Sequence, residues 1–390
     1  MKILIAPDSF KENLTAAEVA TALAAGMAPL LPEATFDLVP MADGGEGTVD
    51  ALVTATHGRR LAAVVTGPLG ERVTAHYGVL GDARTAVIEM AAASGLGLVP
   101  TARRNPLATT SYGTGELVRH ALTQGIDTLI IGIGGSATVD GGAGMCQALG
   151  VRFFDRHDRE ITLAMTGGEL AKVARVDASA LDARLVRLRI QVACDVDNPL
   201  LGPTGAANVF GPQKGATPAQ VAELDYALDV FYRILEATLQ VSVRDTPGAG
   251  AAGGMGAALL AFLHATLRPG VAIVIEAVGL AQRMAGVDLV ITGEGRLDAQ
   301  TLHGKAPHGV AQLARQLGIP VIAVGGSLAD QAEFAFAEVF DAVESCVTLP
   351  MTTAEALAGG TKNLHRAGHR IAQWLRLGMR LTGTQGNQFG

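Results

Sequence analysis

Cysteine and aromatic residues are scarce in this chain of 390 residues. The three cysteines lie far apart, so they form neither a disulfide framework nor the ligand spacing of a zinc site. Proteins without disulfides are typical of reducing compartments, and we expect this one in the cytoplasm. Aromatic residues make up only 4% of the chain, which leaves few side chains on which nucleobases could stack.

Positive charge and long apolar runs are missing as well. The formal net charge is −7 and no run of Lys and Arg occurs, which argues against a nucleic-acid partner. No stretch of about 18 uncharged apolar residues occurs, so we expect no membrane partner. Hydrophobic residues nevertheless make up 49% of the chain, which excludes a disordered protein and predicts a globular one. We expect it to be a monomer or a homodimer.

Glycine, by contrast, is abundant. The chain has 49 glycines among 390 residues, about 13%, where about 7% is usual. They show no collagen-like period and gather in short clusters between apolar segments. Such clusters predict tight loops between strands and helices, in which backbone N–H groups can approach an anion closely.

Strands and helices alternate near both ends of the chain. A capping box at Thr15 and Glu18 begins a helix that runs to about Leu31. The short apolar strands expected there are of the buried, parallel kind. They are Ile3–Ala6, Phe36–Val39, Val287–Thr292, Pro320–Val324 and Ala342–Thr348.

The middle of the chain has a different pattern. Leu61–Thr66 and Arg72–Val79 flank a turn at Gly67–Gly70, which predicts an antiparallel pair. We expect an α/β protein of two domains, in which residues 61–286 form a second α/β domain inserted into a first one made of residues 1–60 and 287–390. Parallel α/β sheets bind ligands beyond the carboxyl ends of their strands, and sites often lie between domains. We therefore expect the active site in the interdomain cleft.

Two well-known nucleotide-binding motifs can be searched for by their glycine patterns. No Walker A motif occurs, so a P-loop is excluded. Gly248–Gly253 matches G-x-G-x-x-G, follows the strand-like segment Leu239–Val243 and precedes a helix expected near residues 253–267, with Glu276 about where a ribose ligand would lie. Chance matches are expected in a chain this rich in glycine and alanine, and no clear second strand ends at Glu276. An NAD(P)-dependent oxidoreductase therefore stays an alternative.

One arrangement recurs where strands are expected to end. A glycine-bearing or polar loop follows the strand and carries carboxylates or small hydrogen-bond donors. Glycine at a helix N-terminus suits phosphate, and Asp and Glu without His or Cys suit Mg²⁺. Lys11, Arg296 and Lys305 could neutralise an anion. Together these are the parts of a phosphoryl-transfer site. The five loops are Asp8–Lys11, Asp43–Gly47, Gly134–Gly142, Asp195–Pro199 and Gly293–Asp298.

Six segments with short, distinctive motifs occur along the chain: Ala6–Lys11, Met41–Thr48, Gly134–Thr138, Cys194–Leu200, Gly250–Gly254 and Thr292–Asp298. In these segments the sequence resembles a known family, the bacterial type I glycerate kinases. The segments occur in the order of the family and cover nearly the whole chain. A local difference is Glu12-Asn13, where the family more usually has a pair of the Gly-Ser type.

The resemblance implies a Rossmann-like or flavodoxin-like parallel-sheet domain with a second α/β domain inserted. It also implies a kinase that phosphorylates D-glycerate with ATP and Mg²⁺ and gives mainly 2-phospho-D-glycerate. Three alternatives stay open: a kinase that gives 3-phosphoglycerate, the oxidoreductase mentioned above, and a non-catalytic sensor of sugar acids.

We hypothesise the following roles in such a reaction. Asp195 is favoured as the group that accepts the proton of the substrate hydroxyl, and Asp8 is the second candidate. Lys11 and Arg296 are expected to hold the carboxylate of glycerate and the transferred phosphate. Further substrate contacts are expected from Ser9, Asp43, Glu46 and Asp298.

The nucleotide and the metal ion are expected at other loops. Glycine-rich backbone at a helix start is expected to bind the phosphates of ATP. Asp197 and Glu294 are the expected Mg²⁺ ligands, directly or through water. The residues expected to contact ATP are Gly134, Gly135, Ser136, Thr138, Gly293 and Gly295.

Overall fold

The computed structural model describes residues 1–302, 304–329 and 336–385, and the chain forms two compact units. The first unit comprises Met1–Asp43 and Val274–Gly390, and the second comprises Gly44–Ile273. The boundaries predicted from the sequence, after residues 60 and 286, lie further along the chain. The difference includes α2 (Thr48–Ala55), which packs against strands of the second unit.

The first unit is built on a parallel sheet with the strand order β13-β12-β11-β1-β2. In chain order this is 2-1-3-4-5, the order of flavodoxin-like folds. The predicted α/β class with a flavodoxin-like parallel sheet is therefore confirmed for this unit. Its strands are β1 (Lys2–Ile5), β2 (Thr35–Leu38), β11 (Leu289–Leu297), β12 (Val321–Leu328) and β13 (Ala342–Ser345).

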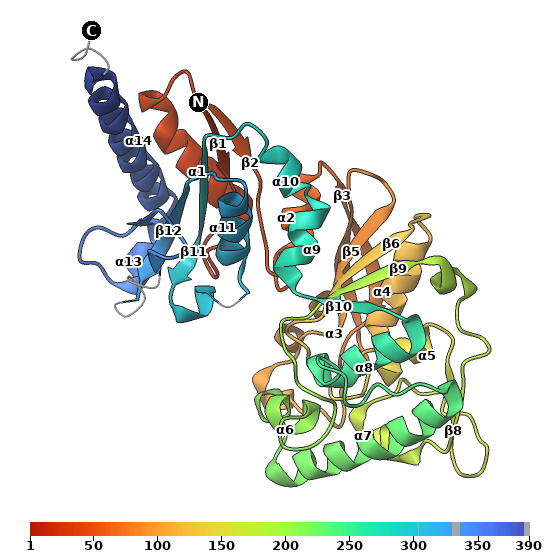
Figure 1. Cartoon of the computed structure of the whole chain (residues 1–390). Helices are drawn as coiled ribbons and strands as arrows, with labels where there is room; N and C mark the ends of the chain where they lie inside the picture. The colour runs from red at the N-terminus through yellow and green to blue at the C-terminus, as the bar shows by residue number, and fades with distance from the viewer. Residues whose placement is uncertain (303, 330–335, 386–390) are drawn as a thin grey trace. The chain divides into compact units, whose positions relative to one another are not determined.

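Helices from the two ends of the chain pack together in this unit. Figure 1 shows α14, in blue, beside α1, in red. The predicted capping box is present, because the side chain of Thr15 accepts the N–H of Glu18 while Glu18 accepts the N–H of Thr15. Ile3 and Ile5 share a buried core with apolar residues of α1 and α14. The helices are α1 (Ala16–Met27), α10 (Leu280–Arg283), α11 (Ala306–Gln316), α13 (Thr353–Ala358) and α14 (Gly360–Gln385), while α9 (Gly270–Ala277) crosses the boundary.

The second unit has a mixed six-stranded sheet with the order β10-β9-β6-β5-β4-β3. The pair β3–β4 is antiparallel, as the sequence predicts, and β5, β6, β9 and β10 run parallel to one another. A separate antiparallel hairpin joins β7 to β8. The strands are β3 (Arg59–Thr66), β4 (Arg72–Val79), β5 (Thr85–Glu89), β6 (Thr128–Gly132), β7 (Arg152–Phe154), β8 (Arg175–Asp177), β9 (Arg189–Ala193) and β10 (Thr266–Arg268).

The helices of the second unit bury one continuous hydrophobic core with this sheet. Phe231 and Tyr232 in α7 and Met255 in α8 are fully buried members of it. None of the helices in the described part of the chain combines the length and the apolar character needed to cross a membrane. The helices are α2, α3 (Ala91–Ser94), α4 (Tyr112–Leu122), α5 (Ala143–Ala148), α6 (Ala206–Phe210), α7 (Pro218–Leu239) and α8 (Ala251–Leu263).

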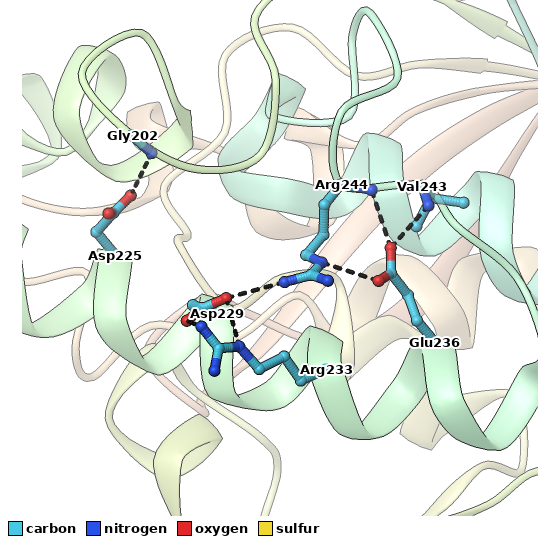
Figure 2. Close-up of polar contacts among 7 residues, drawn as sticks. All are labelled: Gly202, Asp225, Asp229, Arg233, Glu236, Val243 and Arg244. Atoms are coloured by element: carbon cyan, nitrogen blue, oxygen red, sulfur yellow. Dashed lines mark hydrogen bonds and ion pairs between the residues drawn. The ribbon is translucent and has the colours of Figure 1, made fainter.

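The interpretation of Gly248–Gly253 as a dinucleotide motif is not supported by its surroundings. Leu239–Val243 is not a strand, since it includes the end of α7 and the loop after it. Figure 2 shows how Glu236 holds that loop: its carboxylate accepts the backbone N–H groups of Val243 (2.7 Å) and Arg244 (3.1 Å), and the Arg244 guanidinium (2.8 Å). Gly253 instead allows close packing, because a Cβ there would collide with the carbonyl oxygen of Thr138.

Two element boundaries also differ from the prediction. Gly293–Leu297 was expected to be a loop but belongs to β11, where Gly293, Glu294 and Arg296 pair with residues of β12. The helix expected to reach residue 267 ends at Leu263, and residues 266–268 form β10. In β11, pairing with β12 outweighs the weak strand propensity of glycine and charged residues. Residues 266–268 pair with β9 instead of continuing the helix.

Candidate active site

The first unit contains a cavity of about 1000 Å³ at the carboxyl ends of its strands. It lies beside β1 and β11, which is where the strand order of the sheet reverses, and such a position is the usual ligand site of an open α/β sheet. The volume is at the upper end of the range for pockets that hold drug-sized ligands. Eight residues predicted from the sequence line it: Asp8, Ser9, Lys11, Asp43, Glu294, Gly295, Arg296 and Asp298.

Asp8 is the buried carboxylate of this cavity. It follows β1, and its backbone N–H donates to the carbonyl of Gly293 at 2.8 Å, which ties the loop to β11. Burial and the negative charges of Asp43 and Glu294 together raise the pKa of Asp8 to about 7, against the opposing effects of the Ser9 N–H (2.6 Å from Oδ1) and the Lys11 ammonium. A carboxylate in this range can accept a proton near neutral pH.

Two neighbours hold Glu294 in place. Thr301 was not predicted as a site residue, and Lys305 was predicted only as a possible partner of an anion. Thr301 Oγ1 donates to its Oε1 at 2.7 Å, and Lys305 Nζ donates to its Oε2 at 3.0 Å. Lys305 also lines the cavity, immediately before α11. The sequence indicated a positive charge at Lys305, but only the fold brings it to Glu294.

The basic residues Lys11 and Arg296 reach the same cavity from different elements. Arg296 is two residues after Glu294 in β11, so both side chains lie on the same face of the strand. The Arg296 side chain is 69% exposed, with its Nε 3.5 Å from Asp298, and a partly free guanidinium can bind an anion. Glu12, at the position where the chain departs from the family pattern, has φ = 62°, which is unusual for a residue with a side chain.

In the second unit, three of the predicted loops meet at the carboxyl ends of β6 and β9. A Cβ at Gly132 would collide with the carbonyl oxygen of Gly44, and one at Gly44 would collide with Ala193. The loop that carries Glu46 therefore lies against both strand ends. It leads into α2, where the half-buried Glu89 at the end of β5 accepts the N–H of Val49 at 2.8 Å.

The loop after β6 presents backbone donors to solvent. Gly134 and Gly135 are exposed, and no hydrogen bond found among the described residues uses their N–H groups. Gly135 has φ = 72°, a conformation that favours glycine. Unpaired N–H groups in such a loop form a site that suits an anion.

The underside of this loop is buried and held by Lys214, which the sequence analysis missed. Lys214 Nζ donates to Ser136 Oγ at 2.6 Å and to the carbonyl oxygen of Thr138 at 2.7 Å. Burial lowers the pKa of Lys214 to about 7, and the charge of Asp140 opposes this effect. No local pattern marks the residue, since it lies 76 positions from Thr138.

The predicted carboxylates after β9 differ in their surroundings. Asp195 Oδ1 accepts the N–H of Gly270, at the start of α9, at 3.0 Å. Asp197 lies in the same loop and is exposed. Glu46, Gly134, Gly135, Ser136, Thr138, Asp195 and Asp197 thus belong to the second unit, while Gly293 lies within β11 of the first.

Comparison with known proteins identifies the class of protein to which this fold and these loops belong. A model of the glycerate kinase family matches residues 3–376, so the chain belongs to the glycerate kinase family and the prediction of a kinase of that family is confirmed. The chain is 52% identical to the glycerate 2-kinase of Escherichia coli (strain K12) over 383 residues, covering 98% of this chain and 100% of that protein.

Other relatives agree with this assignment. The glycerate kinase of Halalkalibacterium halodurans is 52% identical over 370 residues, covering 95% of this chain and 97% of that protein. A crystal structure from Salmonella typhimurium LT2, assigned as glycerate kinase 2, superposes with a TM-score of 0.90 at 53% identity, covering 97% of this chain and 99% of that one.

Proposed function

We propose that the protein transfers the γ-phosphate of ATP to D-glycerate and gives mainly 2-phospho-D-glycerate. The observation that carries the proposal is the cavity of the first unit, in which the carboxylates Asp8, Asp43 and Glu294 lie with the cations Lys11, Arg296 and Lys305. A small hydroxy acid needs both kinds of group: cations for its carboxylate and hydrogen-bond acceptors for its hydroxyls. Membership of the glycerate kinase family supports this choice of substrate.

The geometry favours Asp8 over Asp195 as the acceptor of the hydroxyl proton. Asp8 is buried in the cavity beside Lys11, whereas Asp195 uses one oxygen to bind the N–H of Gly270. A positioned base would remove the proton as the hydroxyl attacks the phosphate. Lys11 and Arg296 would hold the substrate carboxylate, with Ser9, Asp43, Glu46 and Asp298 as further contacts.

The loop Gly134–Thr138 is proposed to bind the phosphates of ATP. The exposed N–H groups of Gly134 and Gly135 are its donors, as expected from the sequence. Gly293 and Gly295 were also expected at the nucleotide. Gly295 lines the cavity of the first unit, whereas Gly293 packs so closely on Val324 that its role is structural.

The residues present fit a magnesium ion in part. Asp197 is an exposed carboxylate, which is the kind of ligand that Mg²⁺ prefers. Glu294 is a poorer direct ligand, because its charge is already compensated by Lys305 at 3.0 Å and its other oxygen accepts the hydroxyl of Thr301. Within the described ranges, no three His, Cys, Asp or Glu side chains form a group that could hold a metal ion. We propose that Asp197 holds Mg²⁺ together with ATP; when bound, the ion would neutralise phosphate charge.

The proposal also includes the domain organisation, the cellular location and the oligomeric state expected from the sequence. The two compact units would act as two domains, one inserted into the other, and the protein would work in the cytoplasm as a monomer or a homodimer. The three cysteines are free thiols, which fits a reducing compartment.

A coupled assay of ADP release with D-glycerate tests this function. The expected result is ADP formation that depends on both D-glycerate and ATP, with 2-phosphoglycerate as the main product by NMR. If the product is 3-phosphoglycerate, the protein is still a glycerate kinase, but it phosphorylates the other hydroxyl. NAD(P) reduction without ADP would indicate an oxidoreductase, and binding of D-glycerate without turnover would indicate a sensor.

A further inference from the structure

A lysine lies buried beneath the loop that is proposed to bind phosphate. Lys214 ends a short 3₁₀ turn, Pro212–Lys214, and only 2% of its surface is exposed. Its ammonium donates to Ser136 Oγ and to the carbonyl oxygen of Thr138. Burying a charged ammonium is costly, and nearly all buried lysines are paired with a carboxylate.

No carboxylate pairs with Lys214 within the part of the chain that the structure describes. Asp140 is the acidic residue whose charge acts on it. The oxygens of Asp140 are already occupied, because they accept the N–H of Ser111 (2.7 Å), the hydroxyl of Ser111 (2.6 Å) and the N–H groups of Gly142 and Gly144 (3.1 and 3.4 Å). The positive charge of Lys214 is therefore only partly neutralised.

A second polar group beneath the same loop is also unsatisfied. Thr138 is fully buried, and its Oγ1 has no hydrogen-bond partner. A buried hydroxyl without a partner is destabilising, so natural proteins contain few of them. Other contacts hold the loop from the same side: Thr109 Oγ1 donates to the carbonyl oxygen of Ala137 at 2.9 Å, and Ala137 donates to the carbonyl of Ser94.

The two sides of the loop thus differ. Gly134 and Gly135 present unpaired N–H groups to solvent. The ammonium of Lys214 is buried, and it donates to the Ser136 hydroxyl and directly to the backbone carbonyl oxygen of Thr138. Electrostatic effects are strong in such a low-dielectric interior. An anion on the exposed side would supply the negative charge that the buried side lacks.

We propose that Lys214 is a positioning residue for the nucleotide, which fixes the loop Gly134–Thr138 from beneath and attracts the phosphates of ATP through it. This inference rests on the proposed function, because it requires that the loop bind ATP. Lys214 does not touch the ligand in this arrangement. Its effect should therefore fall on the affinity for ATP and leave the affinity for D-glycerate nearly unchanged.

Two variants separate the charge from the mechanical support. Lys214→Met keeps most of the length of the side chain and removes the charge and both hydrogen bonds. Thr109→Val is the matched control, because it removes a neutral hydrogen bond that holds the same loop at Ala137. Binding of ATP to each protein would be measured by calorimetry without D-glycerate, together with the KM values for both substrates.

The expected result is ATP binding weakened about tenfold or more in Lys214→Met and less than about threefold in Thr109→Val, with the KM for D-glycerate unchanged in both. Equal losses in the two variants, or wild-type affinity for ATP in Lys214→Met, would overturn the inference. A wild-type protein that binds ATP but does not phosphorylate D-glycerate would contradict the proposed function alone.

If Lys214→Met does not fold, the proposed role of Lys214 can be tested on the wild-type protein. The charged groups near Lys214 are Asp140, which acts on its charge, and Arg104, whose backbone packs against Gly215. At pH 8 to 9 ATP itself is fully deprotonated, so a proton taken up when ATP binds would be bound by the protein. Calorimetry in buffers of different ionisation enthalpy should give net uptake of up to one proton. Binding without proton uptake would contradict the proposed role of the charge.

Discussion

Lys214 Nζ lies 2.6 Å from Ser136 Oγ, and both residues are buried although they are 78 positions apart in the chain. This contact places an ammonium group under a loop whose upper side carries free backbone donors. It also makes the stability of the second unit depend on pH, because burial holds the pKa of Lys214 at about 7, below its ordinary value of 10.5.

The first prediction concerns that dependence. Between pH 7 and about pH 10 the unfolded chain keeps the lysine protonated while the folded protein releases the proton, so folded stability should rise with pH. The rise is at most about 1.4 kcal/mol per pH unit. Chemical unfolding at pH 7 and pH 9 should show wild type gaining stability relative to Lys214→Met. A difference that does not change with pH would contradict the lowered pKa of Lys214.

The second prediction concerns proton transfer. Asp8→Asn should lower kcat on the order of 10²-fold, because the amide cannot accept the hydroxyl proton. ATP binding, measured by calorimetry, should change little. Asp195→Asn is the matched comparison, since an amide oxygen can still accept the N–H of Gly270. If Asp195→Asn loses more turnover than Asp8→Asn, the role belongs to Asp195.

The third prediction tests the close approach of the loop at Gly44 to the end of β6 in the second unit. Gly132→Ala should destabilise the protein by about 1–3 kcal/mol, because the new methyl group would collide with the carbonyl oxygen of Gly44. Gly97→Ala is the control, since a Cβ at Gly97 meets nothing within 4 Å. Thermal unfolding should separate the two variants, and equal melting temperatures would refute the predicted collision.

The fourth prediction concerns the loop after α7 in Figure 2. Glu236→Gln keeps the shape of the side chain but loses the charge that binds Arg244 and two backbone N–H groups, so we expect a loss of about 1–3 kcal/mol. Glu169→Gln should cost less than about 0.5 kcal/mol, because its pair with Lys172 is exposed. Urea unfolding of both variants checks the difference, and similar losses would show that the network adds little.

Much of the architecture could be predicted from local signals. The strands β1, β2 and β4 and the capping box of α1 follow from short-range patterns, and the structure has each of them within a few residues of the prediction. The extension of β11 through Glu294 and Arg296 could not, because glycine and charged residues are weak strand formers and the pairing partner is about 30 residues away. The interpretation of Leu239–Val243 as a strand was wrong because Glu236 holds that segment as a loop.

Some residues of the candidate site could likewise be selected from the sequence, and others could not. Residue type and position after a strand were enough to select Asp8, Lys11, Glu294 and Arg296, and the fold brings them to one cavity because the carboxyl ends of parallel strands share one edge of the sheet. Thr301, in the short 3₁₀ helix Ala299–Leu302, was not selected, since a single threonine carries no distinctive signal in the sequence. Its importance comes from its contact with Glu294.

The sequence by itself determined the α/β class and the family, and it selected the loops proposed to carry the chemistry, because these depend on periodicity, residue type and short motifs. Only the tertiary structure decided how those groups are supported. The burial that brings the pKa of Asp8 to about 7, the pairing of Glu294 with Lys305 and the position of Lys214 beneath Ser136 all depend on segments distant in sequence. Burial and charge–charge distance are properties of the packed chain, and no local pattern contains them.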